Sequence, residues 1–169
     1  MRGAAALAAI LIAIAVQTTL AGYIFRGSST VIDLVLIVVV YVGIKSGPAT
    51  GTLAGTVAGL IQDALSGGIL GIYGLGKTMV GFLSGLLGTQ FIVTAPLPRF
   101  LLLVVATILH AAIFIGLNRL LNLQQVSADY ASVLGQAFGN AFVGVVAFQM
   151  IEWFPGFVDR RRAGRFLKR

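Results

Sequence analysis

Residues 47–71 read GPATGTLAGTVAGLIQDALSGGILG, and this stretch decides the fold of the chain. Its glycines Gly51, Gly55 and Gly59 recur every four residues, and Asp63 continues the same spacing. In water the segment would be a poor helix, because each glycine costs about 1 kcal/mol relative to alanine. In lipid, residues at this spacing share one helix face, where a second helix can approach backbone to backbone. The stretch therefore predicts a membrane helix suited to close packing.

The composition of the whole chain also indicates a membrane setting. Of its 169 residues, 58% are hydrophobic and 10% are charged, whereas about a quarter of the residues in a soluble domain are charged. The chain has no cysteine and one histidine, which leaves no disulfide framework and no thiolate or histidine-cluster metal site. We therefore expect an all-α, polytopic membrane protein that has no cofactor and no ordinary soluble domain.

Six spans can be drawn as one transmembrane domain over residues 1–157, followed by a basic tail over 158–169. The spans cover about residues 4–25, 31–45, 48–65, 69–92, 100–117 and 131–154. The second is short, since its apolar part covers only about 21 Å of a roughly 30 Å hydrocarbon core. Prolines 96 and 98 should break the chain before the fifth span, and Pro155-Gly156 should end the sixth.

The first span is long enough to cross the bilayer by itself, which favours an uncleaved helix over a cleavable signal peptide, although its small residues leave cleavage open. An even number of spans places both termini on one side. With both termini inside, the inner side carries Arg2, Lys45, Arg99 and the tail, and the outer side carries only Arg26 and Arg119. This asymmetry predicts cytoplasmic termini. A re-entrant pair formed by the second and third spans would change the count.

The net charge of +7 is concentrated in the tail, which holds six of the twelve basic residues. These six are Arg160, Arg161, Arg162, Arg165, Lys168 and Arg169. A basic cluster just after a span ordinarily determines topology and contacts anionic lipid. We therefore interpret the charge as a membrane feature and expect no nucleic-acid partner.

Ionisable side chains within spans are costly, so they tend to have partners and to mark function. Asp63 and Lys77 flank a tight turn at Ser66-Gly67-Gly68, and we predict that they form an ion pair. The alternative is that Asp63 is solvated at the interface and Lys77 snorkels alone. Asp33 begins the second span, where we predict a helix cap that meets the positive end of the helix dipole. A paired-carboxylate site of Asp33 and Asp63 has weaker support.

Two further polar groups lie inside spans. His110 is in the middle of the fifth span and Asn140 is in the sixth, four residues after Gln136. We predict that they hydrogen-bond across helices, with contributions of about 0.5–2 kcal/mol. A proton relay or ligand site is the alternative. No catalytic, cofactor-binding or metal-binding set of residues is recognisable.

Small-residue faces recur on two other spans, each marked by two glycines four residues apart. These pairs are Gly81 with Gly85 and Gly135 with Gly139. Any of the glycine faces can serve packing inside the bundle or the docking of a partner's helix.

Residues 33–75, DLVLIVVVYVGIKSGPATGTLAGTVAGLIQDALSGGILGIYGL, resemble the bacterial rod shape-determining protein MreD family. That family shows a short second span, small residues at four-residue spacing, and then Asp followed by Ser-Gly and Leu-Gly. Here these features are Gly51, Gly55, Gly59, Asp63, Ser66-Gly67 and Leu70-Gly71. Relatives often have a proline before the second span, and this chain lacks one there. The resemblance is specific over about forty residues and architectural elsewhere.

The resemblance implies a non-enzymatic scaffold of the cell-elongation machinery in the bacterial inner membrane. Such a protein binds the single-span coiled-coil protein MreC. It helps to connect MreB filaments with the wall-synthesis enzymes, the RodA glycosyltransferase and its penicillin-binding partner. The fold of the family is similar to that of the substrate-binding subunits of energy-coupling-factor transporters.

A transporter subunit that binds a small solute is the alternative function. A solute pocket needs convergent polar and aromatic groups at one end of the bundle. The outer side offers Asp33, Asp63, Lys77, Tyr73, Asn118 and Asn122. An intramembrane enzyme has no support beyond Asp63 and His110.

Overall fold

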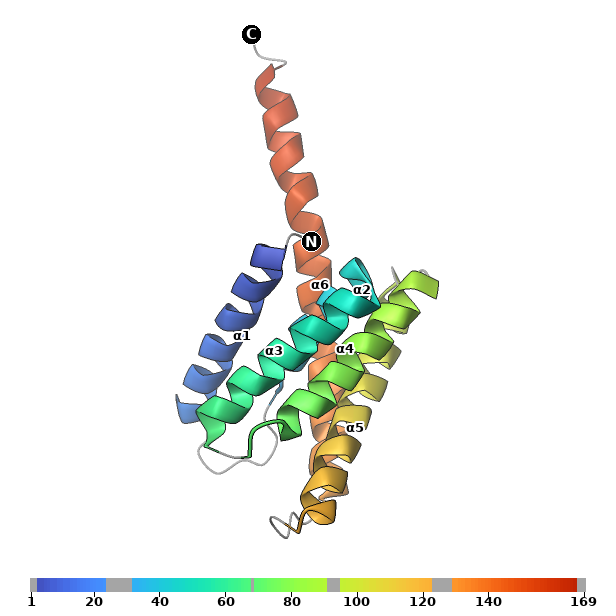
Figure 1. Ribbon diagram of the computed structural model, residues 1–169. Helices are drawn as coiled ribbons and strands as arrows, with labels where there is room; N and C mark the ends of the chain where they lie inside the picture. The colour runs from blue at the N-terminus through green and yellow to red at the C-terminus, as the bar shows by residue number, and fades with distance from the viewer. Residues whose placement is uncertain (1–2, 24–31, 68, 91–94, 123–128, 167–169) are drawn as a thin grey trace.

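The computed structural model describes residues 3–23, 32–67, 69–90, 95–122 and 129–166. These residues form six helices and no strand, which confirms the predicted all-α class (Figure 1). The helices are α1 (Gly3–Tyr23), α2 (Leu34–Ser46), α3 (Pro48–Ser66), α4 (Ile72–Gln90), α5 (Pro96–Leu120) and α6 (Tyr130–Phe166). Consecutive helices run in alternating directions, so α1 begins and α6 ends toward the same end of the bundle.

The short helix α2 is the centre of the bundle, because it contacts each of the other five helices. Its sequence, LVLIVVVYVGIKS, is apolar on every side until Lys45, as expected for a helix that is surrounded. Val35, Val39 and Val42 belong to a core cluster shared with α1 and α3, whereas Leu36 and Val40 belong to a second cluster shared with α4, α5 and α6. The second predicted span therefore forms the shared core.

Two helices extend beyond the predicted spans, and proline is involved in both cases. α5 begins at Pro96 rather than near residue 100, because the first turn of a helix does not need the amides that proline lacks. α6 continues through Pro155 and Gly156 to Phe166, so these residues do not end the sixth helix. An internal proline removes one hydrogen bond, and a long helix can carry it.

The start of α4 also differs from the predicted span over 69–92. Gly71 has a φ of 107°, which is not helical, so α4 starts at Ile72. Some sequence-based predictions fall on residues 2, 26, 31, 91–92 and 167–169, which lie outside the described residues.

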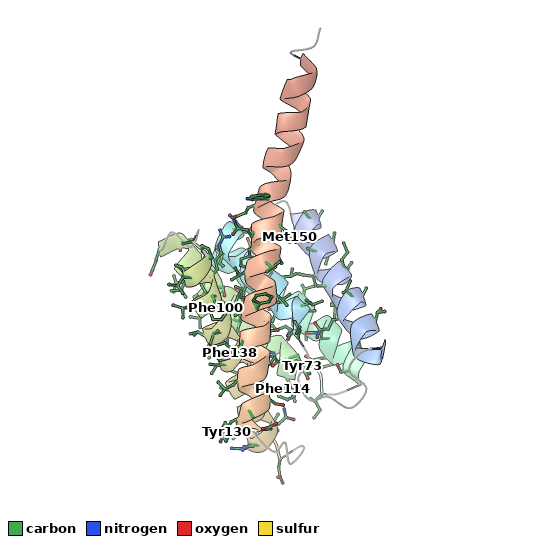
Figure 2. The ribbon with its side chains drawn as sticks, turned by 180° about the vertical axis from the view of Figure 1, so that it is seen from behind. Tyr73, Phe100, Phe114, Tyr130, Phe138 and Met150 are labelled. Atoms are coloured by element: carbon green, nitrogen blue, oxygen red, sulfur yellow. The ribbon has the colours of Figure 1, made fainter. Side chains whose placement is uncertain are left out.

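The surface of the described bundle reverses the pattern of a water-soluble protein, in which charged side chains face outward. Tyr130, Phe138 and Met150 are exposed along α6 (Figure 2), while Lys77 and Arg99 are buried. Within the described ranges, two stretches are long and apolar enough to cross a membrane, Pro96–Leu120 and Tyr130–Trp153.

Candidate functional site: a polar cluster inside the bundle

A buried ion pair lies where α2 begins. The Lys77 ammonium on α4 donates to Oδ2 of Asp33, the residue immediately before α2. The exposed fraction is 0% for Lys77 and 5% for Asp33. The other carboxylate oxygen of Asp33 accepts the backbone N–H of Leu36 at 2.9 Å, which caps α2. A single carboxylate therefore both starts the central helix and neutralises the buried lysine.

This arrangement corrects the expectation that Asp63 pairs with Lys77. The Asp63 carboxylate accepts the backbone N–H groups of Gly71, Tyr73 and Gly74 at 2.8, 3.0 and 3.1 Å. Asp63 is buried near the end of α3, and its three donors lie where α4 begins. Asp63 therefore closes the turn between the two helices. Both of its carboxylate oxygens accept hydrogen bonds from backbone N–H groups.

Asn140 on α6 attaches this site to two more helices. Its side-chain oxygen accepts the backbone N–H of Asp33 at 2.8 Å, and its side-chain nitrogen donates to the Thr107 hydroxyl on α5 at 3.2 Å. Thr107 and Asn140 are both fully buried. We refer to Asp33, Lys77, Thr107 and Asn140 as the polar cluster, and its members come from α4, α5, α6 and the start of α2.

The polar cluster helps to satisfy the backbone N–H groups at the start of α2. The first N–H groups of any helix have no acceptor within the helix, and leaving such a group buried without a partner costs about 1–3 kcal/mol. Besides the bonds from Leu36 and Asp33, the N–H of Val35 donates to the side-chain oxygen of Gln17 on α1 at 3.2 Å. The amino end of α2 can therefore lie inside the bundle.

His110 on α5 lies beside the polar cluster. Its ring stacks on Tyr73 with centroids 5.9 Å apart, and Tyr73 packs against Phe114 at 4.7 Å (Figure 2). The Lys77 ammonium lies 5.6 Å from the centroid of the Tyr73 ring. Among the described atoms, Nε2 of His110 has no hydrogen-bond partner. Gly76 leaves the space for this ring, since a Cβ there would lie 2.8 Å from Cδ2 of His110.

The glycine face of α3 packs against α4 inside the bundle. A Cβ on Gly55 would lie 2.6 Å from the carbonyl carbon of Lys77, and one on Gly59 would lie 2.5 Å from Cα of Gly74. Both distances are shorter than real Cβ contacts allow. Gly51, Gly81 and Gly85 meet backbone atoms of the facing segments in the same way. Since α4 occupies this face, the face has no room for a partner's helix.

The glycines of α6 have different surroundings. Gly135 is exposed. A Cβ on Gly139 would meet only Ile32, at an ordinary contact distance of 3.7 Å. The packing seen around Gly139 therefore does not require a glycine.

A second group of charges, missed by the sequence analysis, lies at the end of the bundle where α6 leaves it. Glu152 on α6 accepts from Lys45 at 2.6 Å and from Nη2 of Arg99 at 2.8 Å. Arg99 is 2% exposed, and its guanidinium lies 6.0 Å from the centroid of the Phe148 ring. The sequence does contain a signal for this group. The only glutamate of the chain lies at the predicted inner end of the sixth span, the side on which Lys45 and Arg99 were also expected.

An apolar exterior around paired interior charges defines the class of this molecule as a helical membrane protein. The chain belongs to the family of the rod shape-determining protein MreD, whose family model matches residues 2–158. This match confirms the resemblance seen in residues 33–75. The family is a membrane component of the Mre rod-shape system and is not a known family of enzymes. Comparisons with curated proteins and with solved structures found no match.

Proposed function

We propose that this protein is a non-enzymatic scaffold of the cell-elongation machinery in the bacterial inner membrane. In this role it binds MreC and helps to couple MreB filaments to peptidoglycan synthesis by RodA and its penicillin-binding partner. The family match over residues 2–158 is the observation that carries the proposal. The carboxylates of Asp33, Asp63 and Glu152 support it, because all three are engaged in helix caps or ion pairs. The family match does not favour the solute-transporter alternative.

We also propose that all six helices cross the membrane, with both termini in the cytoplasm. Tyr130 and Trp153 are exposed near the two ends of the apolar part of α6, and aromatic side chains favour the two membrane interfaces. At 1.5 Å per residue they lie about 34 Å apart, close to the thickness of a roughly 30 Å hydrocarbon core. Lys45 and Arg99 lie at the Trp153 end, as the excess of positive charge on the cytoplasmic side requires.

Fusion reporters test this orientation. Green fluorescent protein joined to the C-terminus should fluoresce, and alkaline phosphatase at the same place should be inactive. Alkaline phosphatase inserted after Asn122 should be active, because that loop is assigned to the periplasm. An active phosphatase at the C-terminus would refute the orientation. The proposed likeness to the substrate-binding subunits of energy-coupling-factor transporters is tested by superposing an experimental structure of this chain on theirs.

We assign the docking of the MreC span to the outer half of α6. The glycine faces of α3 and α4 pack against each other, so neither is free to receive the MreC span. This leaves the glycines of α6. Gly135 is exposed and Gly139 is half-buried, and an exposed glycine allows a second helix to come close in lipid. Leu134 and Phe138 stand exposed beside them and offer apolar contacts to such a helix.

Copurification tests the scaffold and the docking face together. Gly135→Leu should abolish copurification of MreC and leave the protein folded. The matched control is Gly116→Leu on α5, another exposed glycine, with no atom within 4 Å of a Cβ built on it. The control should retain MreC. If MreC does not copurify with the unmodified chain, the scaffold proposal is wrong. If MreC is retained by both variants or lost by both, the docking face is wrong.

A further inference from the structure

A cleft lies between the second half of α4 and the first half of α5. Its volume is about 300 Å³. The residues that line it are apolar except for Ser84. They include Leu83, Ser84 and Leu87 of α4 and Leu101, Val105 and Ala106 of α5. The function proposed above does not use this cleft.

The glycine face of α4 explains why the cleft forms. Near the start of α4, Gly76 lets the helix come close to His110 of α5. Further along, the glycines of α4 face α2 and the start of α3, so α4 packs tightly on those segments and leaves space on the side of α5. These glycines are Gly81, Gly85 and Gly88.

The mouth of the cleft opens on an apolar surface. Leu101 and Val105 are 56% and 63% exposed, whereas Val80 and Ala106 are buried. The part of α5 that lines the cleft belongs to Pro96–Leu120, which is apolar and long enough to cross a membrane. If these helices cross the bilayer as proposed, the mouth faces the hydrocarbon core, where no water is present to fill it.

The size of the cleft favours a single flexible chain as its occupant. A helix with its side chains is about 10 Å across, so the volume of the cleft corresponds to roughly 4 Å of helix, less than one turn. A cavity of about 150 Å³ holds a benzene ring, so one aromatic side chain of a partner would leave about half of the cleft empty. The same comparison gives room for about a dozen carbon atoms of an acyl chain.

Charged side chains at this end of the bundle favour a negative headgroup. The described ones are Lys45, Arg99 and Glu152, which are joined by ion pairs, so two positive charges stand against one negative charge. Arg99 precedes Leu101 of the cleft wall by two residues, and the Lys45 side chain is 39% exposed. Basic groups between membrane helices bind anionic headgroups.

From the lining, the volume and the charge, and resting on the proposed membrane crossing, we infer that the cleft binds one acyl chain of an anionic phospholipid. The chain fills the space that side chains leave between α4 and α5. The headgroup lies at the end of the bundle that carries Lys45 and Arg99.

The first experiment fills the floor of the cleft. Binding of phosphatidylglycerol to the purified full-length protein is titrated by native mass spectrometry in detergent. Ala106→Phe should weaken binding about tenfold or more, because the ring takes about half of the volume and removes the contacts of the chain there. The matched control is Ala112→Phe, an exposed position on the same helix outside the cleft. Absence of binding by the unmodified chain, or equal binding by Ala106→Phe, would overturn the inference.

A second pair of variants acts at the mouth, where a large side chain does not disturb the core. Val105→Trp should also weaken binding of phosphatidylglycerol about tenfold, because it obstructs the entry of the chain. Ile108→Trp is the control, since Ile108 is exposed on α5 and does not line the cleft. Helical circular dichroism checks that all four variants are folded. Equal binding by Val105→Trp and Ile108→Trp would overturn the inference.

The third experiment tests the headgroup. The unmodified chain should bind phosphatidylglycerol more tightly than phosphatidylcholine, and Lys45→Gln should reduce this preference about fivefold, because one basic residue near the headgroup is lost. Arg119→Gln, at the opposite end of the bundle, is the control and should keep the preference. Equal binding of the two lipids by the unmodified chain would overturn the assignment of an anionic phospholipid.

The lipid site and the scaffold can fail separately, because lipid binding is measured without MreC. Ala106→Phe should still copurify with MreC, whose docking is assigned to α6. If Ala106→Phe loses MreC and Ala112→Phe retains it, the cleft receives a side chain of the partner, and the lipid inference is overturned. If MreC does not copurify with the unmodified chain while phosphatidylglycerol binds, the scaffold proposal alone is wrong.

Discussion

Replacing Lys77 by methionine removes the positive charge opposite Asp33 and leaves a carboxylate buried without its cation. Removing one partner of a buried ion pair costs about 3–5 kcal/mol. Lys77 is completely buried and the Asp33 side chain nearly so, so solvent screening gives little relief, and we expect Lys77→Met to fall within this range. The value would be a large part of the stability of a small domain, which is about 5–15 kcal/mol.

The matching change on the other side is Asp33→Asn. Asparagine retains a side-chain oxygen that can accept the N–H of Leu36, so this variant removes the charge and keeps the cap. The double variant Asp33→Asn with Lys77→Met should recover most of the loss, because replacing a whole buried ion pair by neutral groups is often close to neutral. We therefore expect the two single effects to be strongly non-additive.

The measurement is the free energy of unfolding in mixed micelles titrated with sodium dodecyl sulfate, followed by helical circular dichroism. The double variant Asp63→Asn with Lys77→Met is the control. It should be at least as unstable as Lys77→Met alone, because Asp63 binds the backbone of α4. The reasoning is refuted if Asp63→Asn restores stability and Asp33→Asn does not, or if Lys77→Met costs less than about 1 kcal/mol, the value typical of an exposed pair.

Three other substitutions test the remaining contacts, each by the same unfolding measurement. Gly55→Ala should destabilise by about 1–3 kcal/mol through overpacking against α4, whereas Gly116→Ala, with open space around it, should be neutral or stabilise by up to about 1 kcal/mol; equal effects would contradict the assigned packing. Asp63→Ala should cost about 1–3 kcal/mol for each buried N–H left without an acceptor, and a neutral result would disprove the turn closure. Glu152→Gln should lower the free energy of unfolding by about 1 kcal/mol, less than Lys77→Met, because the Glu152 side chain is 32% exposed and its ion pairs are partly screened. A larger loss would mean that Glu152 alone compensates the buried charge of Arg99.

The number and type of the helices could be predicted from the sequence, because apolar runs and glycine spacing are local signals. The four-residue ladder of α3 specifies a face for close packing whatever the partner is. The ladder does not specify its partner, α4, because a glycine face fits a helix of the same bundle or a helix of another protein. For Asp33, position alone indicated a cap, since the residue precedes an apolar run.

The pairing of Lys77 could not be predicted in the same way. Proximity along the chain favoured Asp63, fourteen residues away, whereas the true partner lies 44 residues away. Asp33 comes close only because α2 is central. The apolar sequence of α2 indicates a surrounded helix, but it does not indicate which neighbour brings a cation to Asp33. The prolines misled for a related reason. The effect of a proline depends on its position relative to the helix start: Pro96 is the first residue of α5, whereas Pro155 lies inside α6.

The dependence of α2 on distant caps has a consequence for biogenesis. Chains are synthesised from the N-terminus, so α2 emerges before the long-range partners of Asp33. Lys77 follows 44 residues later and Asn140 follows 107 residues later. Until both have left the ribosome, the carboxylate of Asp33 lacks its cation and the N–H of Asp33 lacks its acceptor, at the amino end of a helix only 13 residues long. A chain truncated before α6 would therefore keep this defect permanently, because the N–H of Asp33 would never meet the side-chain oxygen of Asn140.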